Sequence, residues 1–267
     1  MLVDHHCHLD FPQLAARRDE LLARAKAAGV GTMVTISTRI RELPTLLDIC
    51  AAHDDIYCSV GTHPHNADEE RGIPADEIVR LSEHPKVVAI GEAGLDYFYK
   101  KGSPEAQAEG FRTHIEAARR TGLPLEIHTR DADADTIAIL EDEHRKGAFP
   151  AILHCYTGGP ELARRAVELG LHVSFTGVVT FKKNEALRDI ARAVPLERML
   201  VETDAPFLAP EPYRGKINEP SYVVHTAATL AELKGVSPEA FAAATTDNFF
   251  RLFRKAKRPP ASRTAAA

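Results

Sequence analysis

The chain has 267 residues, a length typical of one parallel barrel of alternating strands and helices and sufficient for a full hydrophobic core. Its formal net charge of −5 at pH 7 argues against a protein that coats duplex nucleic acid, because such proteins carry a basic excess. No apolar run reaches the ~18 residues of a membrane span, and the chain starts with a strand instead of a secretory signal, so we expect a cytoplasmic monomer with no membrane partner.

Short apolar runs alternate with amphipathic helical stretches along the whole chain. The expected strands cover residues 2–3, 31–36, 56–61, 86–90, 123–127, 150–153, 171–175 and 198–201. The expected helices cover residues 17–28, 41–53, 75–83, 104–121, 134–146, 160–169, 183–193, 220–233 and 238–254. Eight strands that are each followed by a helical stretch predict an α/β fold, a (β/α)8 TIM barrel in a single domain over residues 1–254. A doubly wound open sheet is the alternative architecture.

The end of the chain and its cysteines carry no clear functional pattern. Residues 255–267 are basic and rich in alanine and proline, so we expect a disordered tail that aids solubility. Cys7, Cys50, Cys58 and Cys155 have no regular spacing, which predicts reduced, buried thiols away from any metal, and neither disulfides nor a zinc module.

Six side chains that are common metal ligands follow apolar runs spread over two hundred residues: His6, His8, Glu92, His128, His154 and Asp204. Each lies where a buried strand would pass into its loop. Since the active sites of parallel barrels are built from those ends of several strands, the six can converge although they are far apart in sequence. The pattern predicts a metal site at the carboxyl end of the barrel.

His6 and His8 are two residues apart, and because side chains alternate along a strand, both are expected to point into the barrel. Asp4 is expected on the same face, where it would orient an imidazole as carboxylates do behind metal-bound histidine. His5 and Cys7 are expected on the outward face, so we interpret His5 as a packing or surface histidine.

Glu92 follows a buried strand, has glycines on both sides and has no basic partner nearby in sequence, so a cation is expected to meet it. A carboxylate can bridge two metal ions, and two ions a few Å apart form the usual clamp for hydrolysis at phosphorus. We therefore expect two divalent ions, with Mg, Mn or Zn open as their identity. His128 and His154 would complete the second ion, and Asp204 would bind the first and accept a proton from the attacking water.

Several blocks of the sequence, taken in order, resemble the TatD family of metal-dependent hydrolases and deoxyribonucleases, within the amidohydrolase superfamily. The blocks are Asp4–Asp10, Gly61–His65, Ile90–Tyr97, His154–Gly158, Ser174–Gly177, Glu202–Pro206 and Asn218–Pro220. The resemblance covers nearly the whole chain and implies a TIM barrel, a divalent-metal centre on the six ligands above, and phosphodiester hydrolysis. One departure is Ile217, which stands where the family commonly has an arginine and which puts substrate choice in question.

Other polar and aromatic loop residues are weaker candidates for substrate contacts. His63 could donate to a substrate phosphate or to the attacking water, and we group it with Glu92 and Asp204 as candidate catalytic residues. His65 and Arg130 could contact phosphate, although an ion pair with a neighbouring aspartate is an equal alternative for Arg130. Tyr156 could stack on a terminal base, as aromatic side chains do in single-strand channels.

These observations favour a metal-dependent phosphodiesterase that trims nucleic-acid ends, a 3′-5′ exonuclease on single-stranded DNA with RNA as a further substrate. Two hydrolase alternatives keep the metal centre: an enzyme for a small ester, amide or lactone, and a deacylase of aminoacyl-tRNA. A non-catalytic, metal-bound interaction module is the alternative from another class, and it is disfavoured because structural metal sites are coordinatively closed.

Overall fold

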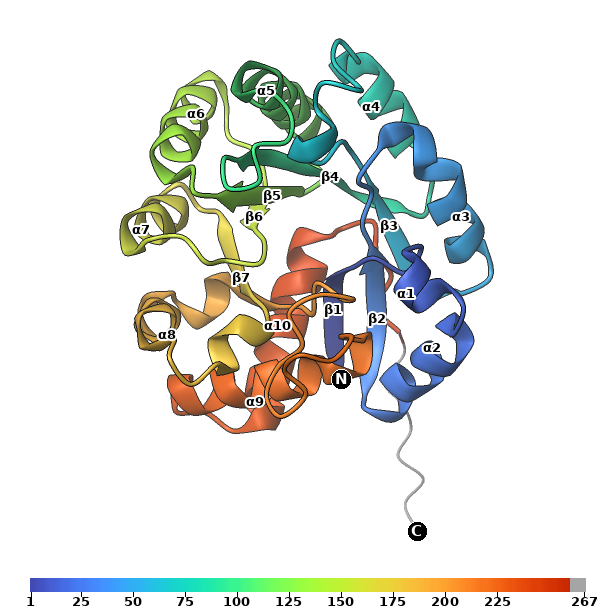
Figure 1. Cartoon of the computed structure of the whole chain (residues 1–267), viewed down its shortest axis with the longest axis vertical. Helices are drawn as coiled ribbons and strands as arrows, with labels where there is room; N and C mark the ends of the chain where they lie inside the picture. Colours follow the sequence, from blue (N-terminus) through green and yellow to red (C-terminus); the bar gives the residue numbers. More distant parts are fainter. Residues whose placement is uncertain (260–267) are drawn as a thin grey trace.

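The computed structural model describes residues 1–259, and its eight strands form one parallel sheet in the order β1 to β8. The strands are β1 (Leu2–Cys7), β2 (Val30–Thr35), β3 (Ile56–Val60), β4 (Val87–Asp96), β5 (Leu125–Arg130), β6 (Ala151–Leu153), β7 (His172–Phe175) and β8 (Met199–Val201). Figure 1 shows them encircled by helices. The predicted TIM barrel is confirmed.

The helices follow the strands in alternation. They are α1 (Pro12–Ala15), α2 (Arg18–Ala27), α3 (Leu43–Ala51), α4 (Ala75–Ser82), α5 (Pro104–Thr121), α6 (Asp133–Lys146), α7 (Pro160–Glu168), α8 (Glu185–Ala193), α9 (Val223–Lys234) and α10 (Pro238–Leu252). None of those in the described part of the chain is long and apolar enough to span a membrane.

Local sequence sets the ends of the longest helix, α5. The first backbone N–H groups of a helix have no partner within it. Ser103 accepts a hydrogen bond from one of them, that of Ala106, and Pro104 in the first turn has no N–H, so the helix starts here. It ends at Gly122, which adopts a left-handed conformation with φ of 69° that favours glycine. These signals explain why the predicted range of this helix matches the structure.

Apolar side chains form two layers of core. The larger layer lies between the strands and the surrounding helices. The smaller one fills the barrel with alternate strand residues, including Val3, Val34 and Ile152, and is completed by Phe249 and Phe253 from α10 and the residue that follows it. Both phenylalanines are fully buried, so the last turn of α10 and Phe253 plug the amino end of the barrel.

Residues 255–259 are part of the packed structure, in contrast to the tail expected from residue 255 onwards. Lys255 Nζ donates to the backbone carbonyls of Ser82 and His84, and Ala256 is buried in the interior layer of core. The basic character of this segment misled the prediction, because the ammonium group of Lys255 serves to cap the end of α4. Residues 260–267, the rest of the expected tail, lie outside the described residues.

The barrel closes between its first and last strands, just beyond the end of β8. The backbone N–H of His8 donates to Ala205 O (2.8 Å) and that of Asp204 donates to His6 O (2.9 Å). Below these bonds, the carboxylate of Asp4 accepts from both the backbone and the hydroxyl of Thr203. Candidate metal ligands from both ends of the chain therefore meet at this seam.

Replacing Phe253 with alanine should lower the free energy of unfolding by about 3–5 kcal/mol, the usual loss for a buried phenylalanine. The reason is the cavity left in the plug of the barrel. Chemical denaturation of both proteins measures the difference, with Phe250→Ala as a matched control, since Phe250 is only partly buried. Equal losses in the two variants would contradict the role given to the plug.

Candidate metal centre

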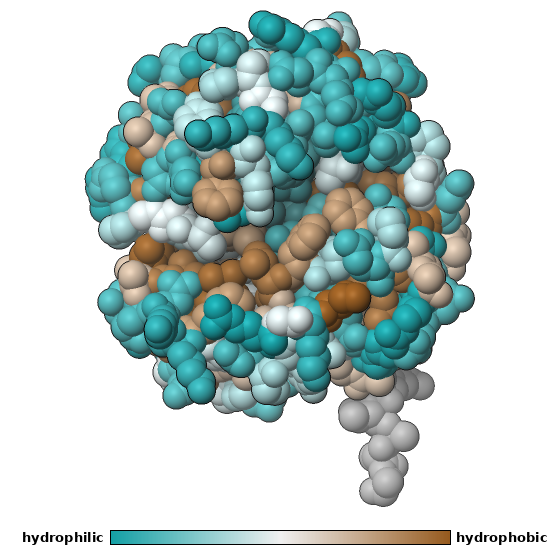
Figure 2. All heavy atoms as spheres, in the orientation of Figure 1, coloured by the Kyte–Doolittle hydropathy of each residue, from teal (hydrophilic) through white to brown (hydrophobic). Residues whose placement is uncertain are grey.

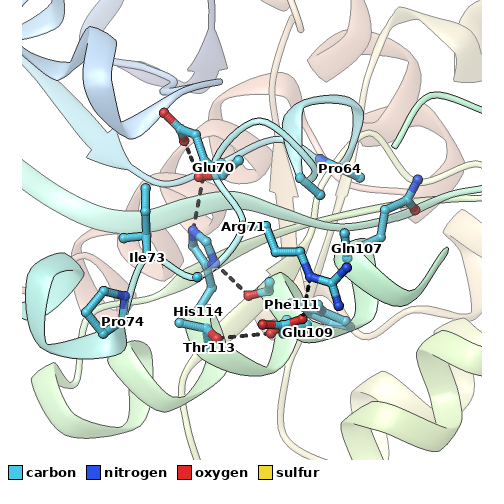
Figure 3. Close-up of a pocket in the computed structure, with 16 residues that line it drawn as sticks. Pro64, Glu70, Arg71, Ile73, Pro74, Gln107, Glu109, Phe111, Thr113 and His114 are labelled. Atoms are coloured by element: carbon cyan, nitrogen blue, oxygen red, sulfur yellow. Dashed lines mark hydrogen bonds and ion pairs between the residues drawn. The ribbon is translucent and has the colours of Figure 1, made fainter. Parts of the chain in front are cut away.

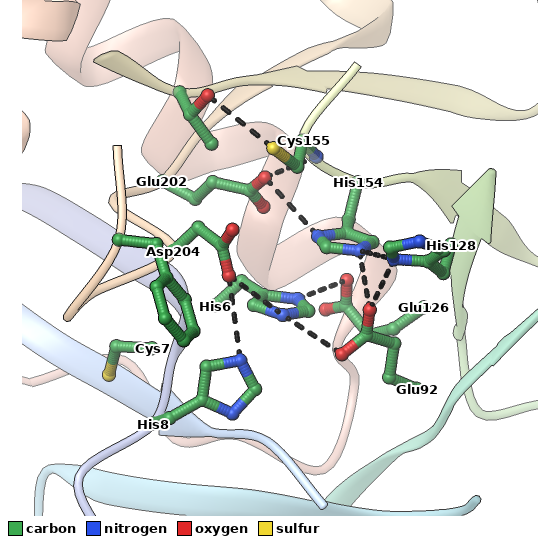
Figure 4. A network of polar contacts seen from close by, with 12 residues as sticks. His6, Cys7, His8, Glu92, Glu126, His128, His154, Cys155, Glu202 and Asp204 are labelled. Atoms are coloured by element: carbon green, nitrogen blue, oxygen red, sulfur yellow. Dashed lines mark hydrogen bonds and ion pairs between the residues drawn. The ribbon is translucent and has the colours of Figure 1, made fainter. Parts of the chain in front are cut away.

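A cavity of about 1110 Å³ opens at the carboxyl ends of the strands. Five of the six predicted ligands line it, namely His8, Glu92, His128, His154 and Asp204. The sixth, His6, lies fully buried beneath them, with Nε2 3.5 Å from Glu92 Oε2 and 3.7 Å from Asp204 Oδ1. Figure 4 shows the six side chains pointing toward one another, and the structure therefore brings the predicted set together.

The expected alternation of side chains along β1 holds for His6, Cys7 and His8 but is wrong for Asp4 and His5. The pairing of β1 with β2 shifts register between Asp4 and Cys7, and the irregularity lets consecutive histidines face the interior. His5 is buried, with Nδ1 3.0 Å from Glu126 Oε1 and Nε2 2.9 Å from Glu202 Oε2. Asp4 contacts Thr203 and no imidazole, so it does not orient a ligand as expected.

Glu92 occupies the middle of the centre. Its Oε1 lies 2.8 Å from both His128 Nδ1 and His154 Nε2, while its Oε2 faces His6. The structure extends β4 past Glu92, so the carboxylate projects from within a strand and not from its end. Gly94 makes this geometry feasible, since a Cβ there would lie 2.0 Å from the backbone oxygen of His128.

Two groups of ligand atoms share Glu92. One consists of His6, His8 and Glu92, the other of His63, Glu92 and His128, and within each group all ligand atoms lie within 4.8 Å of one another. His6 Nε2 is buried and has no hydrogen-bond partner among the described residues, so this nitrogen suits a cation once its proton is released. Imidazole nitrogens with carboxylate oxygens fit divalent ions such as Zn or Mn.

A second layer of carboxylates lies behind the imidazoles, and sequence reasoning missed it. Glu126 Oε2 is 3.4 Å from His6 Nδ1, Glu202 Oε1 is 3.6 Å from His154 Nδ1, and Asp96 Oδ2 is 3.1 Å from His128 Nε2. Each carboxylate faces the nitrogen turned away from Glu92, which fixes ring orientation. A signal was present for two of them, because Glu126 and Glu202 stand two residues before a predicted ligand and so share its face.

His5 joins two of these carboxylates. Burial by itself lowers the pKa of His5, but the adjacent Glu126 and Glu202 outweigh it and raise the pKa to about 10. The resulting imidazolium holds one carboxylate at each of its nitrogens, and Ser174 Oγ also lies 2.6 Å from Nε2. His5 therefore ties together the groups that orient His6 and His154.

The pKa values of the ligands reflect this crowding of charge. Burial raises the pKa of Glu92, yet His154 and His63 outweigh it and hold the pKa well below its ordinary value. Burial lowers the pKa of His63 well below its usual range, so this imidazole is neutral at pH 7 and free to bind a cation. The centre therefore combines the anionic Glu92 with the neutral His63 in one buried space.

The remaining candidates differ in their places. His63 Nε2 lies 3.5 Å from Glu92 Oε1, and His65 Nε2 lies 2.8 Å from Asp96 Oδ2. Arg130 lines the cavity and forms no ion pair within residues 1–259, so the aspartate pairing considered for it is not made. Tyr156 is buried and its hydroxyl donates to Gly159 O, so the structure does not bring it into the cavity.

The cysteines and Ile217 are not among the six predicted ligands. All four cysteines are free thiols, as predicted, and Cys7, Cys50 and Cys58 are buried. Cys155 differs from the expectation, because it is only partly buried and lines the cavity of the metal centre. Ile217, the departure from the family pattern, is 58% exposed and lines a separate groove instead of the metal cavity.

A smaller cavity of about 190 Å³ lies beside the loop that carries His63 (Figure 3). His114 of α5 accepts the backbone N–H of Thr62 at Nε2 and contacts Gly110 O through Nδ1. Glu70 accepts the Thr62 hydroxyl and the backbone N–H groups of Ile40 and Arg41. These hydrogen bonds around the cavity hold the loop after β3 in place.

A family model described as TatD related DNase matches residues 3–254. The chain belongs to the TatD family. The Escherichia coli (strain K12) protein named uncharacterized metal-dependent hydrolase YcfH is 43% identical over 255 residues, covering 94% of this chain and 95% of that protein. A Citrobacter rodentium protein named 3′-5′ ssDNA/RNA exonuclease TatD is 34% identical over 258 residues, covering 94% and 97%.

Solved structures agree with the family. The crystal structure of YjjV, a TatD homologue from Escherichia coli K12, matches with a TM-score of 0.87 and 28% identity over 95% of this chain and 98% of that one. The chain is therefore a metal-dependent hydrolase of the TatD family.

Metal binding to this TatD-family protein should release protons at pH 7. Burial and the charge of His154 lower the pKa of His6, but the adjacent carboxylates of Glu126 and Glu92 outweigh them and raise it to about 9. A metal ion needs the neutral imidazole. Since a raised pKa keeps the proton on to higher pH, apparent affinity should increase as pH rises from 6.5 toward about 9.

Calorimetry in two buffers with different ionisation enthalpies counts the released protons. Glu126→Gln removes one of the carboxylates that raise the pKa of His6 and should lower the count. Glu143→Gln alters a buried carboxylate on α6, outside the centre, and should leave it unchanged. A binding enthalpy that is the same in both buffers would show that the imidazoles are already neutral.

Proposed function

We propose that this protein is a phosphodiesterase with two divalent ions, Mg, Mn or Zn, and that it shortens single-stranded DNA or RNA from the 3′ end. The observation that carries the proposal is the sharing of Glu92 by two groups of ligand atoms. A single carboxylate between two cation sites is the arrangement that two-metal hydrolysis at phosphorus uses.

In this proposal His6, His8 and Asp204 would hold one ion, His128 and His154 would hold the other, and Glu92 would serve as a ligand to both. Asp96, Glu126 and Glu202 keep the imidazoles in place from behind. The ions supply positive charge that polarises the phosphodiester and lowers the pKa of water in the cavity.

Asp204 is the proposed acceptor of the proton from the attacking water. Its side chain is 14% exposed at the cavity, in contrast to the more deeply buried Glu92, and Oδ1 lies 3.5 Å from His8 Nε2. Its backbone is held in a left-handed conformation with φ of 57°, by the bond from its N–H to His6 O and by the turn to Pro206. A carboxylate held at the open side of the centre can receive a proton and return it to solvent.

The preference for nucleic acid draws on the comparisons and on the cavity. The family description names a DNase, and the Citrobacter relative is named an exonuclease of single-stranded DNA and RNA. A cavity of about 1110 Å³ exceeds the range usual for a drug-sized ligand and has room for a strand end. The acidic net charge is compatible with this substrate, since bound ions provide local positive charge.

Incubation of the metal-loaded protein with single-stranded DNA and RNA labelled at the 5′ end tests the proposal, with Mg, Mn and Zn compared. We expect a ladder of products that shorten from the 3′ end. Hydrolysis of esters or lactones, or release of the amino acid from aminoacyl-tRNA, without any shortening of either strand would favour one of the other hydrolases. Metal binding without any hydrolysis would favour an interaction module.

Glu92→Gln should abolish the bridging of the two cation sites while keeping the fold, because the amide has the same shape but lacks one anionic oxygen. We expect fewer bound ions per chain and a fall in cleavage rate of about 100-fold or more. Elemental analysis, thermal unfolding of the metal-free protein and strand cleavage give the three readouts, with Glu143→Gln as the matched control. Near wild-type cleavage with full metal content would rule out a bridging role for Glu92.

Asp204→Asn should leave substrate binding largely intact and slow the chemical step by about 100-fold or more, the usual scale for loss of a general base. The acidic limb of the pH–rate profile should also flatten. Single-turnover cleavage across a pH series measures both effects. A loss of only a few-fold, or full rescue by higher metal concentration, would mean that Asp204 is only a ligand and that His63 is the next candidate for the base.

A further inference from the structure

Beyond the ligands, Tyr99 and Arg130 line the cavity, and Phe98 lies against Arg130 beside them. Phe98 and Tyr99 follow β4 and are 50% and 51% exposed, although both are large aromatic residues. The guanidinium of Arg130, at the end of β5, lies 3.8 Å from the ring centre of Phe98 and 4.7 Å from that of Tyr99. These three residues are called the Arg130 platform below.

The Arg130 platform is held by the same carboxylate that supports the metal centre. Asp96 Oδ1 accepts the backbone N–H groups of Phe98 and Tyr99, both at 3.0 Å. Its other oxygen, Oδ2, contacts His128 Nε2 at 3.1 Å and His65 Nε2 at 2.8 Å. One rigid, nearly buried side chain therefore fixes the platform relative to a metal ligand.

The Arg130 platform also lies close to the metal centre. The ring of Tyr99 meets the ring of His65 edge to face at 5.2 Å, and His65 meets His63 at 4.4 Å. His63 in turn lies 3.5 Å from Glu92. A group attached to a phosphate at the centre would therefore reach the platform within one nucleotide.

The chemistry of the platform matches a nucleotide better than it matches other ligands. The described residues offer Arg130 no carboxylate partner, so its charge is available to a phosphate. The exposed faces of Phe98 and Tyr99 provide planar apolar surface, on which any base can stack. Figure 2 shows apolar side chains gathered around a hollow in the middle of the face it presents.

A second aromatic pair elsewhere lacks this combination. Tyr213 and Tyr222 stack on each other at 4.1 Å, so each ring already covers a face of its neighbour. The arginine beside them in that groove, Arg24, is paired with Glu219. The feature that this groove lacks is a guanidinium free of carboxylate partners beside its rings, since Arg24 is paired.

We propose that the Arg130 platform binds the nucleotide next to the scissile bond, with its base stacked on Tyr99 or Phe98 and its phosphate held by Arg130. This inference rests on the proposed nuclease function and extends it. A base can stack there only when it is unpaired, so the platform selects single-stranded ends over duplex ends. The selectivity comes from this wall of the cavity and not from the metal centre.

The test compares a normal short single strand with the same strand lacking its 3′-terminal base. Anisotropy of the labelled strands, with Ca²⁺ added and with the protein otherwise intact, gives affinities without relying on cleavage. The wild-type protein should bind the normal strand about 5- to 150-fold more tightly than the abasic strand, the range for one stacked base. In the Phe98→Ala/Tyr99→Ala double variant this ratio should fall to about 1, since the stacking partner is gone.

Phe250→Ala and Arg258→Met are the matched controls. They form the same kind of pair, with the guanidinium 4.9 Å from the ring centre, on the segment that plugs the opposite end of the barrel. Both should keep the wild-type ratio. A ratio that persists in the double variant, a wild-type ratio of 1, or an equal loss in the controls overturns the proposal. A base-dependent ratio in a protein that cleaves no strand would uphold the platform and refute the nuclease function.

Discussion

The rest of the site depends on one constraint, the burial of several carboxylates at the carboxyl end of the barrel. Glu92, Glu126 and Glu202 are each 2% exposed or less. A buried anion is tolerated only when cations and hydrogen-bond donors surround it. Imidazoles on or just after β1, β3, β5 and β6 meet this need, and the single positive charge of His5 lies between the two deepest carboxylates. A pair of divalent ions would balance the negative charge that remains near Glu92. Metal binding would therefore also stabilise the buried carboxylates.

Much of the fold could be predicted because local residue patterns indicate where its helices and strands begin and end. The ends of α5 follow from Ser103, Pro104 and Gly122, and the ligands were found because parallel strands bring their carboxyl ends together. The irregularity in β1 could not be predicted, since a shift in register arises from pairing with a neighbouring strand and has no signature in the residues themselves. His5 was consequently assigned to the wrong face. The platform was missed for a similar reason, because exposure and stacking depend on how two loops meet.

Asp96 links the two halves of the active-site cavity. One of its oxygens fixes the backbone under Phe98 and Tyr99, and the other fixes His128. Burial raises the pKa of this carboxyl, but hydrogen bonds from His128, Tyr99 and His65 outweigh it and hold the pKa below its ordinary value. It therefore remains an anion that can accept from all of its partners at once. A single side chain, Asp96, thus fixes the position of the Arg130 platform relative to His128. The platform would receive a base, and His128 would hold an ion.

The closure of the barrel has a consequence for how the chain is made. His6 and His8 leave the ribosome before their partners across the seam, Asp204 and Ala205, which emerge only after seven further strands. Phe253 and its neighbours, which plug the amino end, emerge later still. A nascent chain therefore exposes an unpaired edge of β1 and an open interior through most of translation. Closure of this barrel must therefore wait until Asp204, Ala205 and Phe253 have been made, and until then the edge of β1 lacks its partner at the seam.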